Sequence, residues 1–500
     1  MTEHIQPVKM SMPKLIGLVL GPLLFILTLV FMSASEDLSK QAIFVLAATI
    51  WIAVWWITEP IPIPATSLLP LVLFPLGGVM NAGATAANYG ADIIFLFLGG
   101  FMLAIAMERW NLHTRVALNI INIIGTTTSR IILGFMLATG IMSMFVSNTA
   151  AVMIMIPIGL ALILEAENLV GNHKNDALRK FEKVLVLAIG YAGTIGGLGT
   201  LIGTPPLIIL SGQMNEMFGF EINFAKWMLV GVPTVLILLI VSWLYLTTFV
   251  FKSDMKNLPG GKETIQAELK KLGKMSMEEI TVLVIFILAA VLWIVRGFVK
   301  NIELFSLVQD GTIAIFITVL LFVMPAKSKG GKILDWSVAR DVPWGVLLLF
   351  GGGLTIAKAI TESALDQWLS AQLVMVKGMP VILIVAIVAL FVLMLTEITS
   401  NTATATMILP LLGALAITLN VHPMILMAPA AMAANCAFML PVGTPPNAIV
   451  FGTGKVTIKD MVAAGFWLNI IAWIIIVIVA MIFLPIVFDF NITPFPEIFK

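Results

Sequence analysis

Two identical polar triplets, Ser-Asn-Thr, interrupt long apolar stretches of this 500-residue chain, at 147–149 and at 400–402. Each triplet supplies two hydroxyl groups and a side-chain amide, and backbone N–H groups are available where a helix begins after it. These donors favour an anion, because a helix N-terminus carries roughly half a positive charge. The triplets therefore predict two anion-binding tips.

A second motif, Gly-Thr-Pro-Pro, also occurs twice, at 203–206 and 443–446. Glycine permits an unwound turn, and the prolines donate no N–H and fit the first turn of a new helix. Each motif predicts a crossing that is broken in mid-membrane, with carbonyl oxygens before the break available to a hard cation. No Lys, Arg or His lies near any of the four motifs. This favours coupling to an ion such as sodium, which would offset the charge of a bound anion.

The composition predicts a polytopic membrane protein, because 60% of the residues are hydrophobic, 11% are charged and the mean hydropathy is +1.07. A net charge of +1 gives no case for nucleic acid. The single cysteine, Cys436, excludes a disulfide framework and a cysteine-based metal site. The Gly-rich stretch 193–206 contains neither GxGxxG nor a Walker lysine. We therefore expect neither an enzyme nor an organic cofactor.

Apolar segments long enough to cross a bilayer predict an all-α fold of about eleven transmembrane helices. They lie near 15–33, 41–57, 61–79, 92–108, 184–212, 227–250, 279–297, 310–325, 343–360, 425–452 and 465–488. Two further apolar stretches, 131–164 and 380–418, are too long for one helix and are interrupted by the triplets. We expect each of them to form a re-entrant helical hairpin.

Basic residues predict the orientation in the cell membrane. With the N-terminus in the cytoplasm, most of the 28 Lys and Arg fall in cytoplasmic loops and the C-terminus is exterior. Arg296 and Lys300 fit this arrangement least well. The first hairpin then opens to the cytoplasm and the second to the exterior. The chain is divided into an N-terminal segment with the first helix (1–40), a first repeat (41–250), a cytoplasmic linker (251–278) and a second repeat (279–500).

The sequence motifs indicate that the two repeats are copies of one unit in opposite orientations. FLGGFMLA at 97–104 resembles FGGGLTIA at 350–357, and Phe97 precedes Ser147 by as many residues as Phe350 precedes Ser400. A single Gly-rich match is explained equally well by helix packing, but three motifs in the same order favour duplication. Inverted repeats with interrupted helices are typical of transporters whose site lies between the halves.

Glu397, three residues before the second triplet, is the one acid close to a tip. It is a candidate proton or cation site. The alternative, which we favour, is a carboxylate that accepts hydrogen bonds from the hairpin backbone.

These paired motifs resemble those of the divalent anion/sodium symporters, the DASS or INDY-type family of di- and tricarboxylate transporters. The resemblance covers nearly the whole chain. It implies a homodimer, with a scaffold domain and a transport domain that carries both hairpins across the membrane like an elevator. It also implies C4 dicarboxylates such as succinate, malate and fumarate as substrates, with 2-oxoglutarate, citrate or sulfate in some branches. Sodium symport and dicarboxylate exchange both occur in the family.

The resemblance also implies roles for individual residues. Substrate carboxylates would contact Ser147, Asn148, Thr149, Ser400, Asn401, Thr402, Thr444 and Pro445. A first sodium site would comprise Ser143, Ser147, Asn148 and Gly203, and a second Thr396, Thr399, Asn401 and Gly443. Leu207 stands where the second copy has Asn447, which argues against equal roles there. The alternative function is a cation/proton antiporter or an inorganic oxyanion transporter, for sulfate or a metalloid, of related fold.

Overall fold

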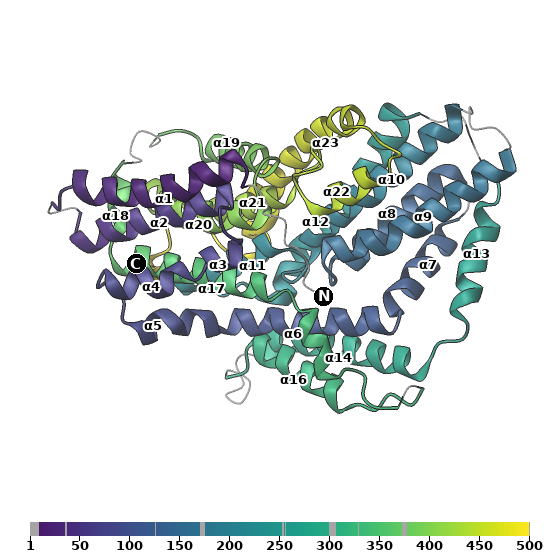
Figure 1. Cartoon of the computed structure of the whole chain (residues 1–500), viewed down its shortest axis with the longest axis horizontal. Coiled ribbons are helices and arrows are strands. Elements are labelled where there is room, and N and C mark those ends of the chain that lie inside the picture. Colours follow the sequence, from purple (N-terminus) through teal and green to yellow (C-terminus); the bar gives the residue numbers. More distant parts are fainter. Residues whose placement is uncertain are drawn as a thin grey trace, which may run out of the picture.

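The computed structural model describes residues 10–35, 38–125, 127–170, 176–252, 255, 257–299, 307–328, 330–372 and 378–499. Lys300, the first nine residues of the N-terminal segment, and residues 253, 254 and 256 of the linker lie outside the described residues. Within the described part, all regular elements are helices and the only bridges between extended residues are isolated ones (Figure 1). The all-α fold is therefore confirmed.

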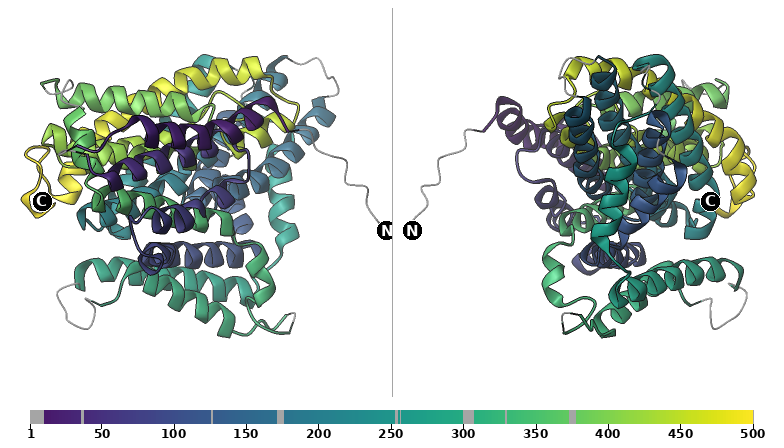
Figure 2. Two further views of the ribbon diagram at one scale, coloured as in Figure 1. Left: turned by 60° about the vertical axis from the view of Figure 1, so that its left-hand side comes forward. Right: turned by 90° about the vertical axis from the view of Figure 1, so that its right-hand side faces the viewer.

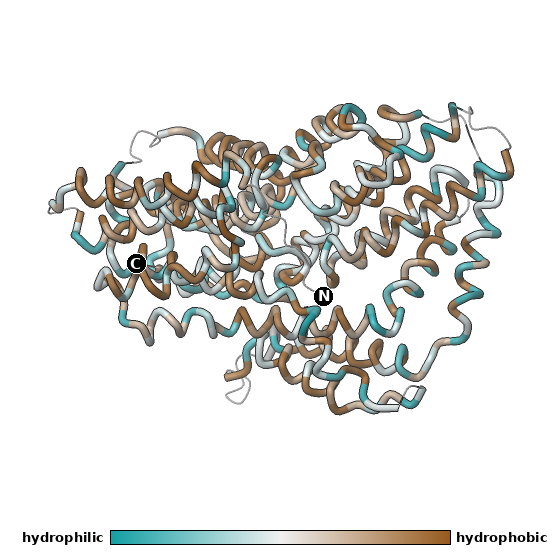
Figure 3. Tube along the Cα trace, viewed as in Figure 1, coloured by the Kyte–Doolittle hydropathy of each residue, from teal (hydrophilic) through white to brown (hydrophobic). Residues whose placement is uncertain are grey.

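Ten helices of the described part are long and apolar enough to cross a membrane, and six shorter helices are also apolar. Figure 3 shows apolar residues along most of the long helices. Segment 61–79 was predicted to be one transmembrane helix, but it forms two short helices, α3 (Ile63–Thr66) and α4 (Leu69–Leu76). Each has proline in its first turn, where a missing N–H is tolerated but the preceding helix cannot continue.

The remaining helices outside the hairpins and broken helices pack against them and against one another. In chain order they are α1 (Met12–Phe31), α2 (Lys40–Thr58), α5 (Ala82–Ala87), α6 (Asp92–Arg109), α7 (Leu112–Ile124), α12 (Phe224–Tyr245), α13 (Gly261–Leu272), α14 (Met277–Val299), α16 (Asp310–Val323), α17 (Trp344–Glu362), α18 (Leu365–Gln372), α23 (Ile458–Ile478) and α24 (Leu484–Phe488). Helices α1 and α2 pack together on one side, and α6, α14 and α16 pack together on another (Figure 2).

Both triplets separate two helices, as predicted. The first hairpin is α8 (Thr128–Ser143) and α9 (Asn148–Val170). The second is α19 (Val381–Thr396) and α20 (Asn401–Leu419). In each hairpin the second arm begins at the asparagine of the triplet, so its first N–H groups lie at the tip.

Both Gly-Thr-Pro-Pro motifs end a break in a helix. The first break separates α10 (Asp176–Gly196) from α11 (Pro205–Phe218), and the second separates α21 (Met424–Asn435) from α22 (Pro445–Gly452). The threonine before each proline pair is the N-cap residue and is extended in both copies, with φ −146° and ψ 141° in one and φ −155° and ψ 148° in the other. The two copies of the motif thus fold alike.

A glycine on a neighbouring helix allows close packing against each break. A Cβ on Gly231 of α12 would lie 2.5 Å from the carbonyl oxygen of Leu198, and one on Gly465 of α23 would lie 2.2 Å from that of Phe438. These are closer than Cβ atoms normally approach, so only glycine fits without movement of the break. Helices α12 and α23 therefore hold corresponding positions around the two breaks.

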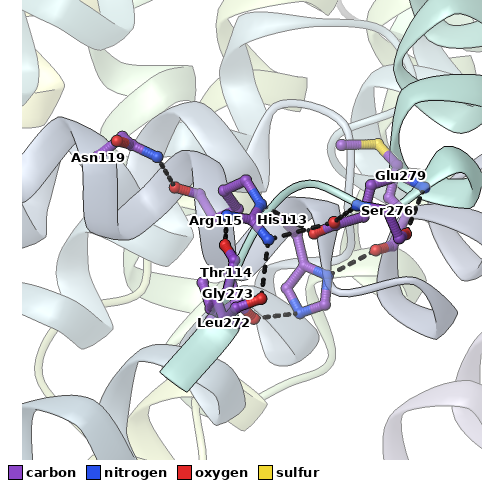
Figure 4. Close-up of polar contacts among 9 residues, drawn as sticks. His113, Thr114, Arg115, Asn119, Leu272, Gly273, Ser276 and Glu279 are labelled. Carbon is purple, nitrogen blue, oxygen red and sulfur yellow. Dashed lines mark hydrogen bonds and ion pairs between the residues drawn. The ribbon is translucent and has the colours of Figure 1, made fainter. Parts of the chain in front are cut away.

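The stretch between the two repeats contains α13, which packs against α7 and α9. Arg115 of α7 holds the end of α13 and the start of α14 (Figure 4). Its guanidinium donates to the carboxylate of Glu279 at 2.9 and 3.2 Å and to the carbonyl oxygens of Leu272 and Gly273 at 3.1 and 2.9 Å. One side chain thus anchors both ends of the turn between α13 and α14.

Candidate functional site

A cavity of about 760 Å³ lies where the two hairpin tips meet the two broken helices. All eight residues predicted to contact substrate line it, namely Ser147, Asn148, Thr149, Ser400, Asn401, Thr402, Thr444 and Pro445. Three residues predicted for sodium alone, Gly203, Thr399 and Gly443, also line it. Ser143 and Thr396 do not; they are fully buried behind the cavity wall. The motifs from the two halves thus converge on one site.

Four helices begin at this cavity. Helices α9 and α20 start at its two tips, and α11 and α22 start at the prolines that line it. Roughly half a positive charge at each N-terminus gives about two positive charges in all. The charged side chains that the structure describes around the cavity are all acidic: Glu59, Glu108 and Asp341. A bound dianion would therefore be balanced by helix dipoles and hydroxyl groups.

Four oxygen-bearing groups gather behind the first tip. We name Ser143 Oγ, Asn148 Oδ1 and the carbonyl oxygens of Gly193 and Gly203 the first oxygen cluster. Ser143 Oγ lies 2.5 Å from the Gly193 oxygen and 2.7 Å from Asn148 Oδ1. The same amide atom of Asn148 lies 3.1 Å from the Gly193 oxygen and 3.3 Å from the Gly203 oxygen. One hydroxyl proton cannot satisfy so many acceptors.

The second tip repeats this arrangement with other residue types. We name Thr396 Oγ1, the inward-facing amide atom of Asn401 and the carbonyl oxygens of Ala434 and Gly443 the second oxygen cluster. Thr396 Oγ1 lies 2.6 Å from this amide atom and 2.7 Å from the Ala434 oxygen. The amide atom of Asn401 that faces the cluster lies 3.2 Å from both the Ala434 and the Gly443 oxygens. With the Asn401 amide oxygen turned inward, this set of neutral oxygens suits a hard monovalent or divalent cation, whereas the amide nitrogen in that place would donate to the same oxygens.

Two residues expected at the sodium sites have hydroxyl groups that bond elsewhere. Ser147 Oγ accepts a hydrogen bond from the Ala150 N–H in the first turn of α9. Thr399 Oγ1 donates to the Leu395 carbonyl and lies 2.6 Å from the hydroxyl of Thr404. The structure therefore brings Ser143, Asn148 and Gly203 together at one tip, while the Ser147 hydroxyl accepts a hydrogen bond from the start of α9.

Sequence reasoning missed Gly193, Ala434 and Asn435. The first two contribute through backbone carbonyl groups only, so no side-chain type marks them. Asn435 is a polar residue in an otherwise apolar helix and lines the cavity. A buried amide in such a helix was a signal that could have been followed.

Glu397 accepts backbone hydrogen bonds, but from a different segment than the hairpin we expected. Its carboxylate accepts from the N–H groups of Phe438, Met439 and Leu440 at 2.8 to 3.2 Å. It also accepts from the side-chain amide of Asn469 at 2.7 Å. The carboxylate therefore holds the middle of the second break, residues 436–444, by accepting from three N–H groups that lie outside any helix.

The repeats also differ after the Gly-Thr-Pro-Pro motif, where the first has Leu207 and the second has Asn447, and this difference too concerns the support of the second break. Asn447 Nδ2 donates to the carbonyl oxygens of Ala437 and Leu440 at 3.0 and 2.9 Å, so it satisfies the break from the other side. In the first repeat, Met144 and Leu207 occupy the positions of Glu397 and Asn447. The second break thus has a polar support that the first lacks.

Two halves of like construction, each with a hairpin and a broken helix that meet at one central cavity, define a multi-pass membrane transporter. Residues 14–489 match the family described as the sodium:sulfate symporter transmembrane region. The chain therefore belongs to this family, the divalent anion/sodium symporters, as its motifs predicted.

Curated relatives cover almost the whole chain. The sodium-dependent dicarboxylate transporter SdcS of Staphylococcus saprophyticus is 62% identical over 488 residues, 97% of this chain and 94% of that protein. SdcS of Staphylococcus aureus strain USA300 is 62% identical over 491 residues, with the same coverage of 97% and 94%.

Two solved structures share the fold at low identity. The Alcanivorax borkumensis YdaH transporter superposes with a TM-score of 0.57 at 12% identity and covers 97% of this chain and 100% of that chain. Neisseria gonorrhoeae MtrF, described as an antimetabolite efflux pump, superposes with a TM-score of 0.58 at 11% identity and covers 95% of both.

Proposed function

We propose that this protein carries dicarboxylates of the succinate, malate, fumarate and 2-oxoglutarate class across the cell membrane by symport with sodium. The observation that carries this proposal is the duplicated site, in which four helix N-termini face one cavity and an oxygen cluster lies directly behind each tip. The 62% identity to proteins named sodium-dependent dicarboxylate transporters supports the same assignment.

Both binding functions follow from the same residues. Asn148 and Asn401 line the cavity and also face the two oxygen clusters. A sodium ion in each cluster would therefore lie next to a carboxylate bound at the tip, and each ion would favour the other's binding. This coupling favours symport over exchange of one dicarboxylate for another.

The alternative functions receive less support. A proton antiporter needs an acid that gains and loses a proton. The carboxylate of Glu397 instead accepts hydrogen bonds from three backbone N–H groups and from Asn469, so it serves to hold the second break in place. Sulfate transport is suggested by the family's description alone. Sulfate is therefore included below as a competitor.

We further propose that the hairpins, the broken helices and the two helices packed closely on the breaks, α12 and α23, move together as the transport domain of an elevator, against a scaffold formed by the other helices. Lys455, just after α22, lies 2.8 Å from the carboxylate of Glu167 on α9 and 3.1 Å from that of Glu182 on α10. Lys183 lies 2.8 Å from Asp460 of α23. These ion pairs join the second repeat to the first and support their movement as one body.

The remaining parts of the proposal concern assembly and orientation. The N-terminus would be cytoplasmic, the C-terminus exterior and the protein a homodimer in the plasma membrane. In this orientation three acidic residues of the cavity lining, Glu59, Glu108 and Asp341, would lie toward the cytoplasm. Crosslinking in membranes and light scattering of the purified protein would measure the oligomeric state.

Uptake by proteoliposomes tests the transport function. Labelled succinate should enter empty vesicles when sodium is higher outside, and unlabelled sulfate should not reduce this uptake. Vesicles preloaded with succinate or 2-oxoglutarate in sodium-free buffer should take up little. Uptake only into preloaded vesicles would establish exchange instead, and uptake in neither condition would refute the dicarboxylate assignment.

The site is tested by Asn401→Ala, which removes the amide from both the cavity and the second oxygen cluster. Uptake should fall to background while the protein stays folded and keeps its oligomeric state. Asn119→Ala, on the exposed surface of α7, is the matched control and should transport normally. Near-normal uptake by the Asn401 variant would contradict the site assignment.

A further inference from the structure

Asn435, the last residue of α21, is fully buried and links the second repeat to three elements of the first. Its Nδ2 donates to the carbonyl oxygen of Thr194 in α10 at 2.6 Å. Its Oδ1 accepts from the hydroxyl of Thr204, the N-cap of α11, at 2.6 Å. The same oxygen accepts from Nδ2 of Asn148, the first residue of α9, at 3.3 Å.

These contacts fix which way both amides point. The carbonyl of Thr194 can only accept, so the nitrogen of Asn435 must face it and the oxygen must face Thr204 and Asn148. Asn148 must then present its nitrogen to Asn435, because the opposite orientation would bring two amide oxygens within 3.3 Å of each other. The oxygen of Asn148 is thereby turned toward the first oxygen cluster.

The orientation matters because Asn148 has a competing alternative. If its amide were turned over, its nitrogen could donate to Ser143 Oγ at 2.7 Å and to the carbonyl oxygens of Gly193 and Gly203 at 3.1 and 3.3 Å. That state satisfies the cluster without any ion, and it places a hydrogen-bond donor against the oxygens that a cation would bind. The cluster is thus a cation site in one orientation of Asn148 and not in the other.

We propose that Asn435 is a positioning residue for the first sodium site, where it holds the Asn148 amide in the cation-binding orientation. This inference rests on the sodium coupling proposed above. The position after Ala434 in the second repeat is matched by Thr194 after Gly193 in the first, and the Thr194 hydroxyl bonds to Gly190 in its own helix. The second repeat therefore supports the sodium site of the first through the amide of Asn435. The first repeat has no amide at the matching position, where Thr194 stands.

Asn435→Ala tests the role in the full-length purified protein. We would measure thermal unfolding against sodium chloride concentration without substrate, with choline chloride keeping the ionic strength constant, and sodium activation of succinate uptake in parallel. The sodium concentration for half-maximal stabilisation should rise by about tenfold or more, as is typical when a residue that orients a metal ligand is lost. The succinate concentration for half-maximal uptake at saturating sodium should change much less.

Asn435→Asp separates positioning from packing. A buried, protonated Asp carboxyl can donate its O–H to the Thr194 carbonyl while its other oxygen still accepts from Thr204 and Asn148, so its sodium response should stay close to that of the wild type even if overall stability falls. Thr139→Val is the control for the loss of a buried polar group nearby, because the Thr139 hydroxyl bonds only to Phe135 in its own helix among the described contacts. Its sodium response should not change.

The outcomes distinguish the two proposals. A wild-type protein without sodium-dependent stabilisation would refute the sodium coupling itself. A normal sodium response in wild type that Asn435→Ala leaves unchanged would refute only the role of Asn435. Equal loss in the Ala and Asp variants would also refute it, since the acceptor oxygen would then not be what matters.

Discussion

The hydroxyl oxygen of Thr396 lies 2.6 Å from the side-chain amide of Asn401, and Ser143 and Asn148 reproduce this relationship at 2.7 Å in the other repeat. In both cases the hydroxyl residue ends the first arm of a hairpin and the asparagine begins the second. The turn between the arms therefore builds the oxygen cluster, whichever β-hydroxyl residue supplies the oxygen.

Replacing Thr396 with valine should weaken sodium binding. Valine keeps the shape but exchanges an oxygen of the second cluster for a methyl group, so the sodium concentration for half-maximal uptake should rise by about tenfold or more. Thr396→Ser should behave like the wild type, because the first repeat has serine at this position. Thr234→Val, whose buried hydroxyl bonds only within α12 among the described contacts, is the control. An unchanged sodium dependence in Thr396→Val would contradict a sodium site here.

Glu397→Gln should destabilise the second break. Glutamine keeps one acceptor oxygen but turns an NH₂ group toward backbone N–H groups, so at least one buried donor loses its partner. We expect a loss of about 1–3 kcal/mol in stability, seen as a lower unfolding temperature. Glu362→Gln, at the exposed end of α17, should not change it. If Glu397 were instead a proton site, the variant would change the pH dependence of uptake without loss of stability.

The pair of Arg115 and Glu279 should stabilise the junction of α7, α13 and α14. Both side chains are largely buried, with 14% and 6% of their side-chain surface exposed. Arg115→Met leaves the carboxylate without its cation, and removal of one partner from such a pair costs about 3–5 kcal/mol. The double change Arg115→Met with Glu279→Met should recover part of the lost unfolding temperature. A double variant less stable than either single one would show that the ion pair is not the source of the stability.

His422 should make stability pH-dependent. Its ring is buried and stacks on Phe490 at 3.9 Å between centroids, and burial lowers its pKa to about 4 from the usual 6.5. The unfolded chain therefore binds a proton near pH 6.5 that the folded chain does not, so stability should fall as the pH falls from about 6.5 toward 4. His422→Gln should reduce this slope between pH 6.5 and 5. An equal slope in that variant would assign the effect to other groups.

Most of the fold could be predicted because its signals are local. Apolar runs mark the spans, and the prolines at 205 and 445 mark the restart of each broken helix at the residue where it occurs. The division of 61–79 was missed because an apolar composition says nothing about a short break, although Pro70 stood beside it. By contrast, Pro157 lies inside α9 and Pro410 inside α20, and neither proline ends its helix.

The site could be predicted only where side-chain chemistry repeats. The two triplets and two Thr-Pro pairs recur in sequence, and all eight predicted substrate contacts line one cavity. The carbonyl groups of Gly193 and Ala434 could not be found this way, since any residue can supply them. The partners of Glu397 depend on how α19 packs against α21 and α23, which no local pattern specifies.

The N–H groups of Phe438, Met439 and Leu440 belong to no helix, yet each donates to the carboxylate of Glu397. A segment without regular secondary structure is usually expected to be flexible. Here the amide protons should exchange with deuterium as slowly as those of the neighbouring helices, so the second break is a rigid element of the site, and motion must be sought elsewhere in the molecule.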